Sequence, residues 1–264
     1  MTEIEQTLDH LEGRVGPQMS LGQRELVLVR LRNLEHSRPE TRARADQIAA
    51  SVRAIDDAEF GALREKLRNG DFTPDDFRTR AQTIPQYDLD GWTRRLFGLH
   101  EVPESSVDLT SDMVGYVTTH TIQVMEMASE LGPKDIFYDL GSGLGFVPIF
   151  LSWLTGARAI GVEIEPNFVR IAQARAEELG LSDKVTFIEG DLREQDYDGA
   201  TAFFMFYPCR DEMLAAVIKK MKSACKGRHV KVYSLGLSSP ALAAEKWLTV
   251  RGQSPSALVA LETK

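Results

Sequence analysis

A short apolar segment followed by closely spaced glycines constrains the fold of this chain more than any other part of its sequence. Residues 136–140, IFYDL, have the composition of a buried strand, and Gly141, Gly143 and Gly145 follow in the pattern GxGxG. Glycine allows the backbone to turn sharply and to approach a ligand closely. The pattern therefore predicts a strand, a ligand-binding turn and a helix in succession, which is typical of α/β proteins.

Strands and helices are predicted to alternate over residues 108–264. We expect strands at residues 136–140, 158–163, 184–189, 200–206, 229–235, about 246–251 and about 256–262. We expect helices at residues 110–131, 144–154, 166–179, 210–224 and 239–245. Strands with uninterrupted apolar runs indicate a parallel sheet that is covered on both faces.

The last two predicted strands differ from the others in their connection. Only a few residues around Pro255 separate them, too few for a helical crossover, so these two strands should pair antiparallel. The sequence therefore predicts a Rossmann-like α/β domain over residues 108–264, with a seven-stranded, mostly parallel sheet and an antiparallel last strand.

Residues 1–107 are predicted to form a helical domain and a linker or lid. Helix signals cover the stretches from Leu21 to Leu34, from Pro39 to about Ile55, from Asp57 to Asn69, and from Thr73-Pro74 onward. The connecting stretch 87–107 is expected to act as a lid or as a packed linker. The helices are expected to pack on the sheet domain or on another copy of the chain, the second of which gives a homodimer.

The charge balance argues against nucleic acid as a partner. The 264 residues include 31 Lys and Arg against 39 Asp and Glu, a net charge of −8, whereas phosphate contacts need a basic surface. A local basic patch remains compatible with this balance. Two cysteines, Cys209 and Cys225, are too few for a disulfide framework or a cysteine metal cluster, so no metal site is predicted. The polar start and the short apolar runs predict a cytoplasmic protein with no membrane segment.

Three carboxylates follow three neighbouring strands of the predicted sheet. Asp139 lies two residues before the first glycine, where it would repel a pyrophosphate and suit a cationic ligand end. Glu163 comes 22 residues after Gly141, where an acid can accept hydrogen bonds from both ribose hydroxyls. Asp191, followed by Leu192, can accept a hydrogen bond from an adenine amine. The ligand so described is adenosine-like, with a cationic amino-acid tail and no phosphate.

These features together resemble the class I S-adenosylmethionine-dependent methyltransferases, over about residues 108–264. The resemblance implies that S-adenosyl-L-methionine is the cofactor and that the protein is an enzyme. It implies that the cofactor is bound by the glycine turn and by the acids at the strand ends, namely Asp139, Gly141, Ser142, Gly143, Gly145, Glu163, Asp191 and Leu192.

A narrower resemblance concerns the segment YVTTHTIQV, residues 116–124, with DLGSGLG and GVEIEP after it. These motifs are similar to those of the non-SET, seven-stranded protein-lysine methyltransferases. The resemblance implies that Thr118 and Thr119 approach the methionine end of the cofactor. A Thr-Thr-His stands here where that family has a proline or a small residue, so the acceptor stays open between a protein lysine and a small molecule.

The predicted fourth strand ends in Phe206-Tyr207-Pro208-Cys209. This sequence does not match the Asn/Asp-Pro-Pro-aromatic motif of enzymes that methylate nucleobase or glutamine amines. An aromatic lining is compatible with desolvating a lysine amine. Methyl transfer from a sulfonium depends mainly on orientation, so Tyr207, Tyr116 and His120 are candidates to assist deprotonation rather than obligatory bases.

The leading hypothesis is an S-adenosylmethionine-dependent methyltransferase that N-methylates an amine such as a protein lysine. Three other functions are compatible with the sequence. The first is methylation of a small metabolite, with the N-terminal helices closing over the pocket. The second is a cofactor-binding module without methyl transfer, against which the complete set of acids argues. The third is an NAD-dependent oxidoreductase.

Overall fold

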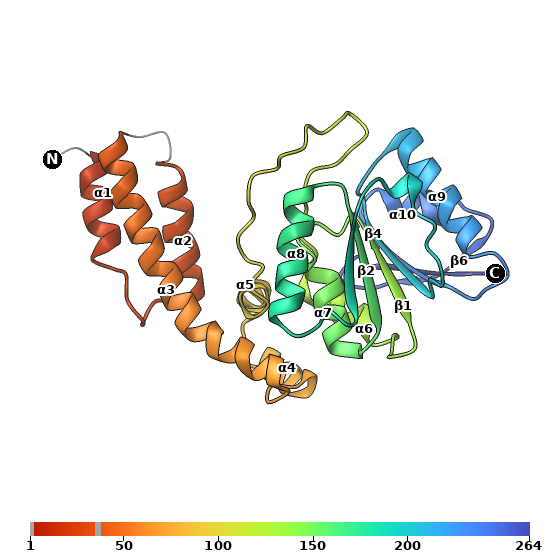
Figure 1. Ribbon diagram of the computed structural model, residues 1–264, viewed down its shortest axis with the longest axis horizontal. Coiled ribbons are helices and arrows are strands. Elements are labelled where there is room, and N and C mark those ends of the chain that lie inside the picture. Colours follow the sequence, from red (N-terminus) through yellow and green to blue (C-terminus); the bar gives the residue numbers. More distant parts are fainter. Residues whose placement is uncertain (1–2, 35–37) are drawn as a thin grey trace. The chain divides into compact units, whose positions relative to one another are not determined.

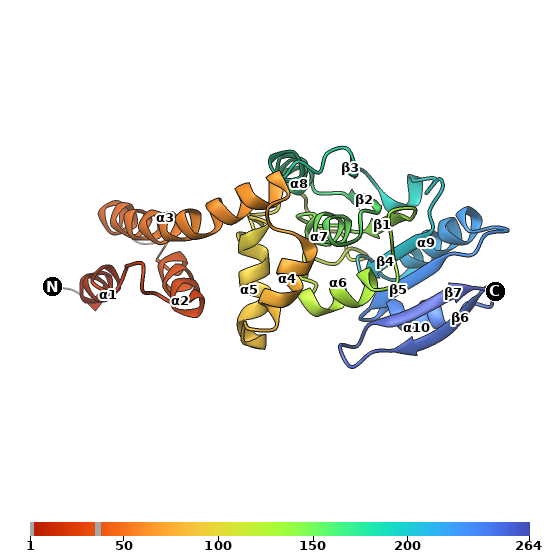
Figure 2. The ribbon, with the colours of Figure 1, turned by 90° about the horizontal axis from the view of Figure 1, so that it is seen from below.

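The computed structural model describes residues 3–34 and 38–264, and the chain divides into two compact units after His100. Figures 1 and 2 show the helices of the first unit and the helix-covered sheet of the second. Among the described residues, no helix combines the length and the apolar character that a membrane crossing needs.

The first unit contains only helices in its described part. They are α1 (Glu3–Glu12), α2 (Leu21–Arg32), α3 (Pro39–Asn69), α4 (Pro74–Ala81) and α5 (Gln86–Leu96). The predicted helix start at Thr73 is confirmed, because the Thr73 hydroxyl accepts a hydrogen bond from the Asp76 backbone N–H and the Asp76 carboxylate bonds back. Helix α5 overlaps the stretch that the sequence predicted as a lid or linker. Its Trp92 packs on Phe60 and Phe77, with ring centroids 6.0 and 5.9 Å apart.

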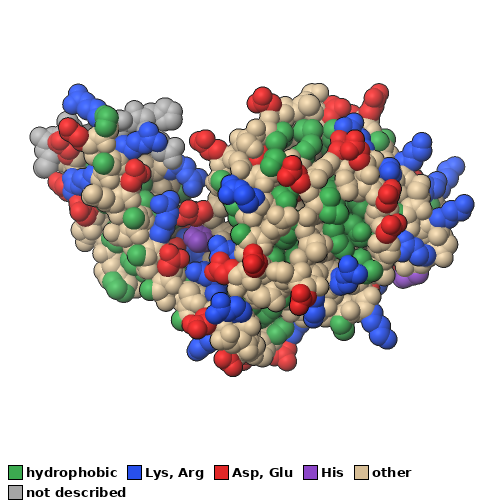
Figure 3. Space-filling view, in the orientation of Figure 1, with side chains coloured by type: hydrophobic (Ala, Val, Ile, Leu, Met, Phe, Trp, Pro, Cys, Tyr) green, Lys and Arg blue, Asp and Glu red, His purple; other side chains and the backbone are tan. Residues whose placement is uncertain are grey.

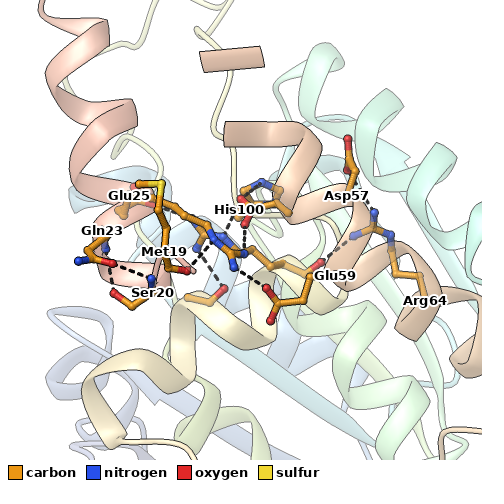
Figure 4. A network of polar contacts seen from close by, with 12 residues as sticks. Met19, Ser20, Gln23, Glu25, Asp57, Glu59, Arg64 and His100 are labelled. Atoms are coloured by element: carbon orange, nitrogen blue, oxygen red, sulfur yellow. Dashed lines mark hydrogen bonds and ion pairs between the residues drawn. The ribbon is translucent and has the colours of Figure 1, made fainter. Parts of the chain in front are cut away.

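The predicted break between two helices near Asp57 is wrong, because α3 runs through it. Asp56 is 2% exposed and accepts hydrogen bonds from Arg24 of α2 at 2.8 Å and from Arg95 of α5 at 3.0 Å. Arg24 also pairs with Glu59 at 2.6 Å, and Figure 4 shows this network joining the helices. The acids beside the predicted helix start at Asp57 therefore form ion pairs with residues that are distant in sequence.

The second unit is built on a seven-stranded sheet. Its strands are β1 (Ile136–Leu140), β2 (Arg158–Glu163), β3 (Val185–Glu189), β4 (Ala202–Phe206), β5 (Lys231–Leu235), β6 (Leu248–Gln253) and β7 (Val259–Thr263). The strand order is β3-β2-β1-β4-β5-β7-β6, with β1 to β5 parallel and β7 antiparallel to both its neighbours. The predicted sheet is confirmed, including its antiparallel last strand.

Helices cover both faces of this sheet, as Figures 1 and 2 show. One face carries α6 (Thr121–Ala128), α7 (Phe146–Thr155) and α8 (Pro166–Glu178), and the other carries α9 (Asp211–Ala224) and α10 (Ser238–Ala243). A short 3-10 helix, η1 (Leu192–Glu194), follows β3. The central strands β1 and β4 are almost wholly buried, as expected for a parallel sheet between two helical layers.

The predicted helix over residues 110–131 is wrong in its first half, because the helix begins only at Thr121. Before it the chain runs alongside the end of β4: Met113 forms an antiparallel bridge with Cys209, and the Val114 N–H donates to the Pro208 carbonyl at 3.2 Å. The Arg210 N–H donates to the Asp112 carbonyl at 2.9 Å. These bonds to a distant strand hold the segment extended.

Candidate functional site

The glycine turn lies at the carboxyl end of β1, and three of its residues have left-handed backbone conformations. The φ angles are +85° at Gly141, +52° at Gly143 and +80° at Gly145. A Cβ at Gly143 would lie 2.4 Å from the Tyr116 ring, and one at Gly141 would lie 2.6 Å from the Pro208 Cβ. Both the conformation and the space therefore require glycine here. Tyr116 covers the turn from one side and Pro208 from another.

Asp139 ends in the turn as a buried carboxyl group with no partner. The residue is 3% exposed, and no hydrogen bond to its carboxylate comes from residues 3–34 or 38–264. Burial, together with the nearby charge of Glu163, raises its pKa well above the ordinary value. A buried carboxylate without donors is costly, and a cationic donor would relieve that cost. Asp139 therefore fits the charged end of an amino-acid-type ligand.

Ser142, predicted with the glycines as a cofactor residue, is also buried. Its Oγ has no hydrogen-bond partner among the described residues, and it would lie 2.6 Å from a Cβ at Gly161 of β2. The hydroxyl thus points toward the neighbouring strand. Only the backbone of Ser142 is left to face a ligand in the turn.

Glu163, at the end of β2, is fixed against the turn by backbone donors. Its Oε2 accepts from the Gly143 N–H at 2.7 Å, and its Oε1 accepts from the N–H groups of Ile164 and Glu165 at 2.8 and 3.0 Å. A carboxylate offers about four acceptor positions, of which these bonds use all but one. The carboxylate is therefore well oriented, but two ribose hydroxyls can be accepted only if one of these bonds is exchanged.

Asp191 follows β3 and is engaged by its own loop. Arg193 Nε donates to both carboxylate oxygens at 3.0 Å, and the Arg193 backbone N–H donates to Oδ1 at 2.8 Å. Hydrogen bonds from the Arg193 side chain lower the Asp191 pKa. Leu192 beside it is half-buried and packs on the core. The structure thus places Asp191 at the predicted strand end, with a competing cation that the sequence analysis missed.

The extended segment before α6 contains the predicted residues Tyr116, Thr118, Thr119 and His120, and it places Tyr116 against the glycine turn. The Tyr116 ring packs edge-to-face on Phe168 of α8 at 5.5 Å. Thr119 is buried, whereas Thr118 and His120 are exposed. His120 caps α6, and its backbone N–H donates to the Gln123 side chain at 2.9 Å. Of the predicted bases, Tyr116 lies against the turn, while His120 occupies a helix start.

Tyr207 directly follows β4 in a strained backbone conformation. Its φ is +48°, a value that is uncommon for a residue with a side chain. Its N–H donates to the Ser238 Oγ at 3.3 Å, and a Cβ at Gly236 would lie 3.5 Å from the Tyr207 Cβ. Leu237 after β5 is 65% exposed. Strain of this kind costs about 1–3 kcal/mol and is concentrated at functional sites. The aromatic pattern predicted Tyr207, but nothing in the sequence indicated its strain.

A loop at the start of the second unit is fastened to the same edge of the sheet. Glu165, which is 3% exposed, accepts from Ser105 Oγ at 2.7 Å, Ser106 N–H at 2.6 Å and Val107 N–H at 3.0 Å. Burial alone would raise the pKa of Glu165, but hydrogen bonds from the Ser106 and Ser105 hydroxyls and from the Asn167 and Ser106 N–H groups lower it to about 2. These bonds attach residues 105–107 to the second unit, which covers residues 101–264.

Parts of this chain are similar to known proteins. A family model described as a methyltransferase domain matches residues 137–228. A protein-lysine N-methyltransferase of Saccharolobus islandicus is 32% identical over 40% of this chain and 69% of that protein. A ribosomal protein L11 methyltransferase of Pelotomaculum thermopropionicum is 33% identical over 24% of this chain and 20% of that protein. An erythromycin 3''-O-methyltransferase of Saccharopolyspora erythraea is 35% identical over 28% of this chain and 24% of that protein. An RNA methyltransferase of Salinibacter ruber, crystallised with S-adenosyl-L-homocysteine, is 26% identical over 56% of this chain and 92% of that one, with a TM-score of 0.43.

The strand order, the glycine turn and the acids at the strand ends define a Rossmann-like methyltransferase domain. The chain belongs to the class I S-adenosylmethionine-dependent methyltransferases, a family of enzymes whose cofactor is S-adenosyl-L-methionine. It spans 69% of the lysine methyltransferase but only 20% and 24% of the other two relatives. The residues present fit that cofactor, because Asp139 offers an unpartnered carboxylate to its cationic end and Glu163 keeps one acceptor position for a ribose hydroxyl.

Proposed function

We propose that this chain transfers a methyl group from S-adenosylmethionine to the side-chain amine of a protein lysine. The observation that carries the proposal is the likeness to the lysine methyltransferase of Saccharolobus islandicus, which covers 69% of that protein. The chemistry of the site supports it. Tyr207 and the exposed Leu237 offer apolar surface at the ends of β4 and β5, where an aliphatic lysine stem can pack.

In this proposal the protein contributes binding and orientation. S-adenosylmethionine supplies an electrophilic methyl group on a sulfonium. Asp139 holds the cationic end, Glu163 accepts the ribose hydroxyls, and Asp191 turns from Arg193 toward the adenine amine. Tyr116, packed over Gly143, excludes water from the turn.

The lysine must lose its proton before it can attack. An exposed lysine has a pKa of about 10.4, and burial against apolar side chains lowers it. Tyr207 and Tyr116 are the hydroxyl groups proposed to aid this deprotonation by accepting a hydrogen bond from the amine and orienting it, while the proton itself leaves to water. His120, which is exposed at the start of α6, is proposed to assist the same deprotonation.

The proposal is tested with unstructured peptides that contain lysine, matched to the same peptides with arginine in its place. Formation of S-adenosylhomocysteine and a mass gain from a deuterated methyl donor should appear only with the lysine peptides. Tyr207→Phe and His120→Ala proteins, with cofactor affinity measured alongside, test the residue roles. Unchanged turnover in both would remove those roles, and methylation of arginine peptides to the same extent would overturn the lysine assignment.

A small-molecule acceptor is the second candidate, favoured by the 35% identity to an erythromycin O-methyltransferase over 77 residues. Free amino sugars and macrolide alcohols added to the same assay distinguish the two. Turnover with these compounds and none with any peptide would assign the site to a metabolite.

A further inference from the structure

The end of α9 and the chain that follows it carry only positive charge. Residues 219–231 contain six of the 31 Lys and Arg residues and none of the 39 acids, in a chain whose net charge is −8. Figure 3 shows blue side chains gathered along the edge where Figure 1 places α9, with a histidine beside them. We refer to five of these residues as the basic patch: Lys219, Lys220, Lys222, Lys226 and Arg228.

The favourable effect of cations at a helix C-terminus does not account for this number. Arg228 already satisfies that end, because it donates to the Ala224 carbonyl in the last turn and to the Ala200 carbonyl at 3.0 Å. Lys219 and Lys222 lie three residues apart on the helix, where like charges repel. In the described part of the chain, neither of these two lysines nor Lys226 has an ion-pair partner.

The basic patch surrounds a hollow that contains an aromatic ring. A groove of about 740 Å³ is lined by Lys222, Lys226, Arg228, His229 and Trp247, together with Thr263 of β7 and Lys264 after it. Trp247 is half-buried, and its indole N–H is fixed by Glu245 at 2.8 Å. A second groove of about 700 Å³, also lined by Ser223, brings in Lys219 and Lys220 together with Arg193 and two acids, Asp196 and Asp198, and Lys220 pairs with Asp196 at 3.6 Å. Cations thus flank a tryptophan that is held in place.

We propose that the basic patch binds single-stranded nucleic acid, with phosphates on the lysines and a base against Trp247. Cations that follow a backbone beside an aromatic side chain are the usual means by which proteins bind single strands. An acidic peptide could pair with the lysines, but it has no nucleobase to stack on the Trp247 indole. A membrane-binding surface would present exposed apolar side chains. Among the described residues, no large exposed apolar side chain lines either groove.

The groove beside Trp247 lies at the opposite edge of the sheet from the cofactor residues, whereas the groove of Lys219 and Lys220 is also lined by Arg193, the partner of Asp191. The parallel strand β5 begins at Lys231, just after the patch, whereas Asp139 and Glu163 are at the carboxyl ends of β1 and β2. Binding of nucleic acid is therefore separable from methyl transfer. It also qualifies the sequence-based expectation, because the net charge of the whole chain conceals a local basic surface.

The test is fluorescence anisotropy with labelled 12-nucleotide oligouridine and oligothymidine. Four neutralised phosphates predict a slope of about −3 in log K against log salt, so affinity should fall about 50-fold between 50 and 200 mM salt. Lys222→Glu/Lys226→Glu should abolish binding. The control, Lys134→Glu/Lys184→Glu, makes the same charge change at exposed positions just before β1 and β3 and should bind like the wild type.

Trp247→Leu separates stacking from charge: it should weaken binding about tenfold and leave the salt slope unchanged. S-adenosylhomocysteine affinity should stay the same in every variant, which shows that the sheet domain is folded. No binding at 50 mM salt, an equal loss in the control variant, or equal binding of polyglutamate or anionic vesicles would overturn the proposal. Unequal affinity for the two oligonucleotides assigns the partner to RNA or to DNA.

Discussion

Replacing Asp139 with asparagine should stabilise the ligand-free protein and weaken cofactor binding at the same time. The carboxylate is buried, has no donor among the described residues, and has a pKa raised by burial. A raised pKa means that the folded state holds a proton which the unfolded state releases above its ordinary pKa. Stability is therefore lost as pH rises through the unfolded value of 3.8 and is not regained at neutral pH. Asparagine does not titrate, so the variant should lack this pH-dependent loss of stability.

The two effects can be estimated from the site. An unsatisfied buried polar group costs about 1–3 kcal/mol and a charged one costs more, so the neutral side chain should gain about 1–2 kcal/mol. For a unit of this size that gain raises the melting temperature by about 2–8 °C. Loss of a charge-assisted hydrogen bond to the cationic end of the cofactor, worth about 1.5–3 kcal/mol, weakens binding about 10- to 150-fold.

Melting curves between pH 5 and pH 8 measure the first effect, and titration calorimetry with S-adenosylhomocysteine measures the second. The wild-type melting temperature should fall across this range relative to that of the variant. Asp183→Asn, at an exposed position before β3, is the matched control and should change neither quantity. A variant that melts lower than the wild type and binds S-adenosylhomocysteine equally well would refute the reasoning, since Asp139 would then be a structural group.

Three further outcomes are expected. Gly143→Ala places a methyl group against the Tyr116 ring at φ +52°, so the second unit should lose about 1–3 kcal/mol in urea unfolding and bind S-adenosylhomocysteine poorly. Asp56→Ala leaves two buried arginines without their shared carboxylate and should destabilise the helical unit by about 3–5 kcal/mol, with cofactor affinity unchanged by calorimetry. The pKa of Glu165 is lowered from 4.5 to about 2, so its contribution to stability is complete above pH 4.5 and is lost toward pH 2. The protection of the amides of residues 105–107 against hydrogen exchange, relative to the intrinsic rate at each pH, should therefore decrease over that range, and constant protection would count against the attachment.

The sheet could be predicted because its strands are short apolar runs set off by glycine and proline. Local patterns failed where distant contacts decide the conformation. The segment before α6 looked helical, but Met113 pairs with Cys209 at the end of β4. The acids near residue 57 looked like a helix start, but Asp56 belongs to an ion network with α2 and α5.

The candidate site could be predicted in outline for a related reason. Glycines and acids at strand ends are visible in the sequence, and the parallel topology brings them to one edge of the sheet. The environment of each acid is not visible: Asp139 has no partner, whereas Asp191 is held by Arg193. These differences arise from loop conformations that no periodicity encodes.

Glu163 and Glu165 lie two residues apart, and one peptide N–H connects their roles. The N–H of Glu165 donates to Glu163 Oε1, while the Glu165 carboxylate holds residues 105–107. A ribose that takes over Glu163 Oε1 deprives this N–H of its acceptor, and the backbone that presents the Glu165 carboxylate is then free to shift. Residues 105–107 are thus connected to the candidate ribose acid, Glu163, through a single peptide group nearly 60 positions later in the chain.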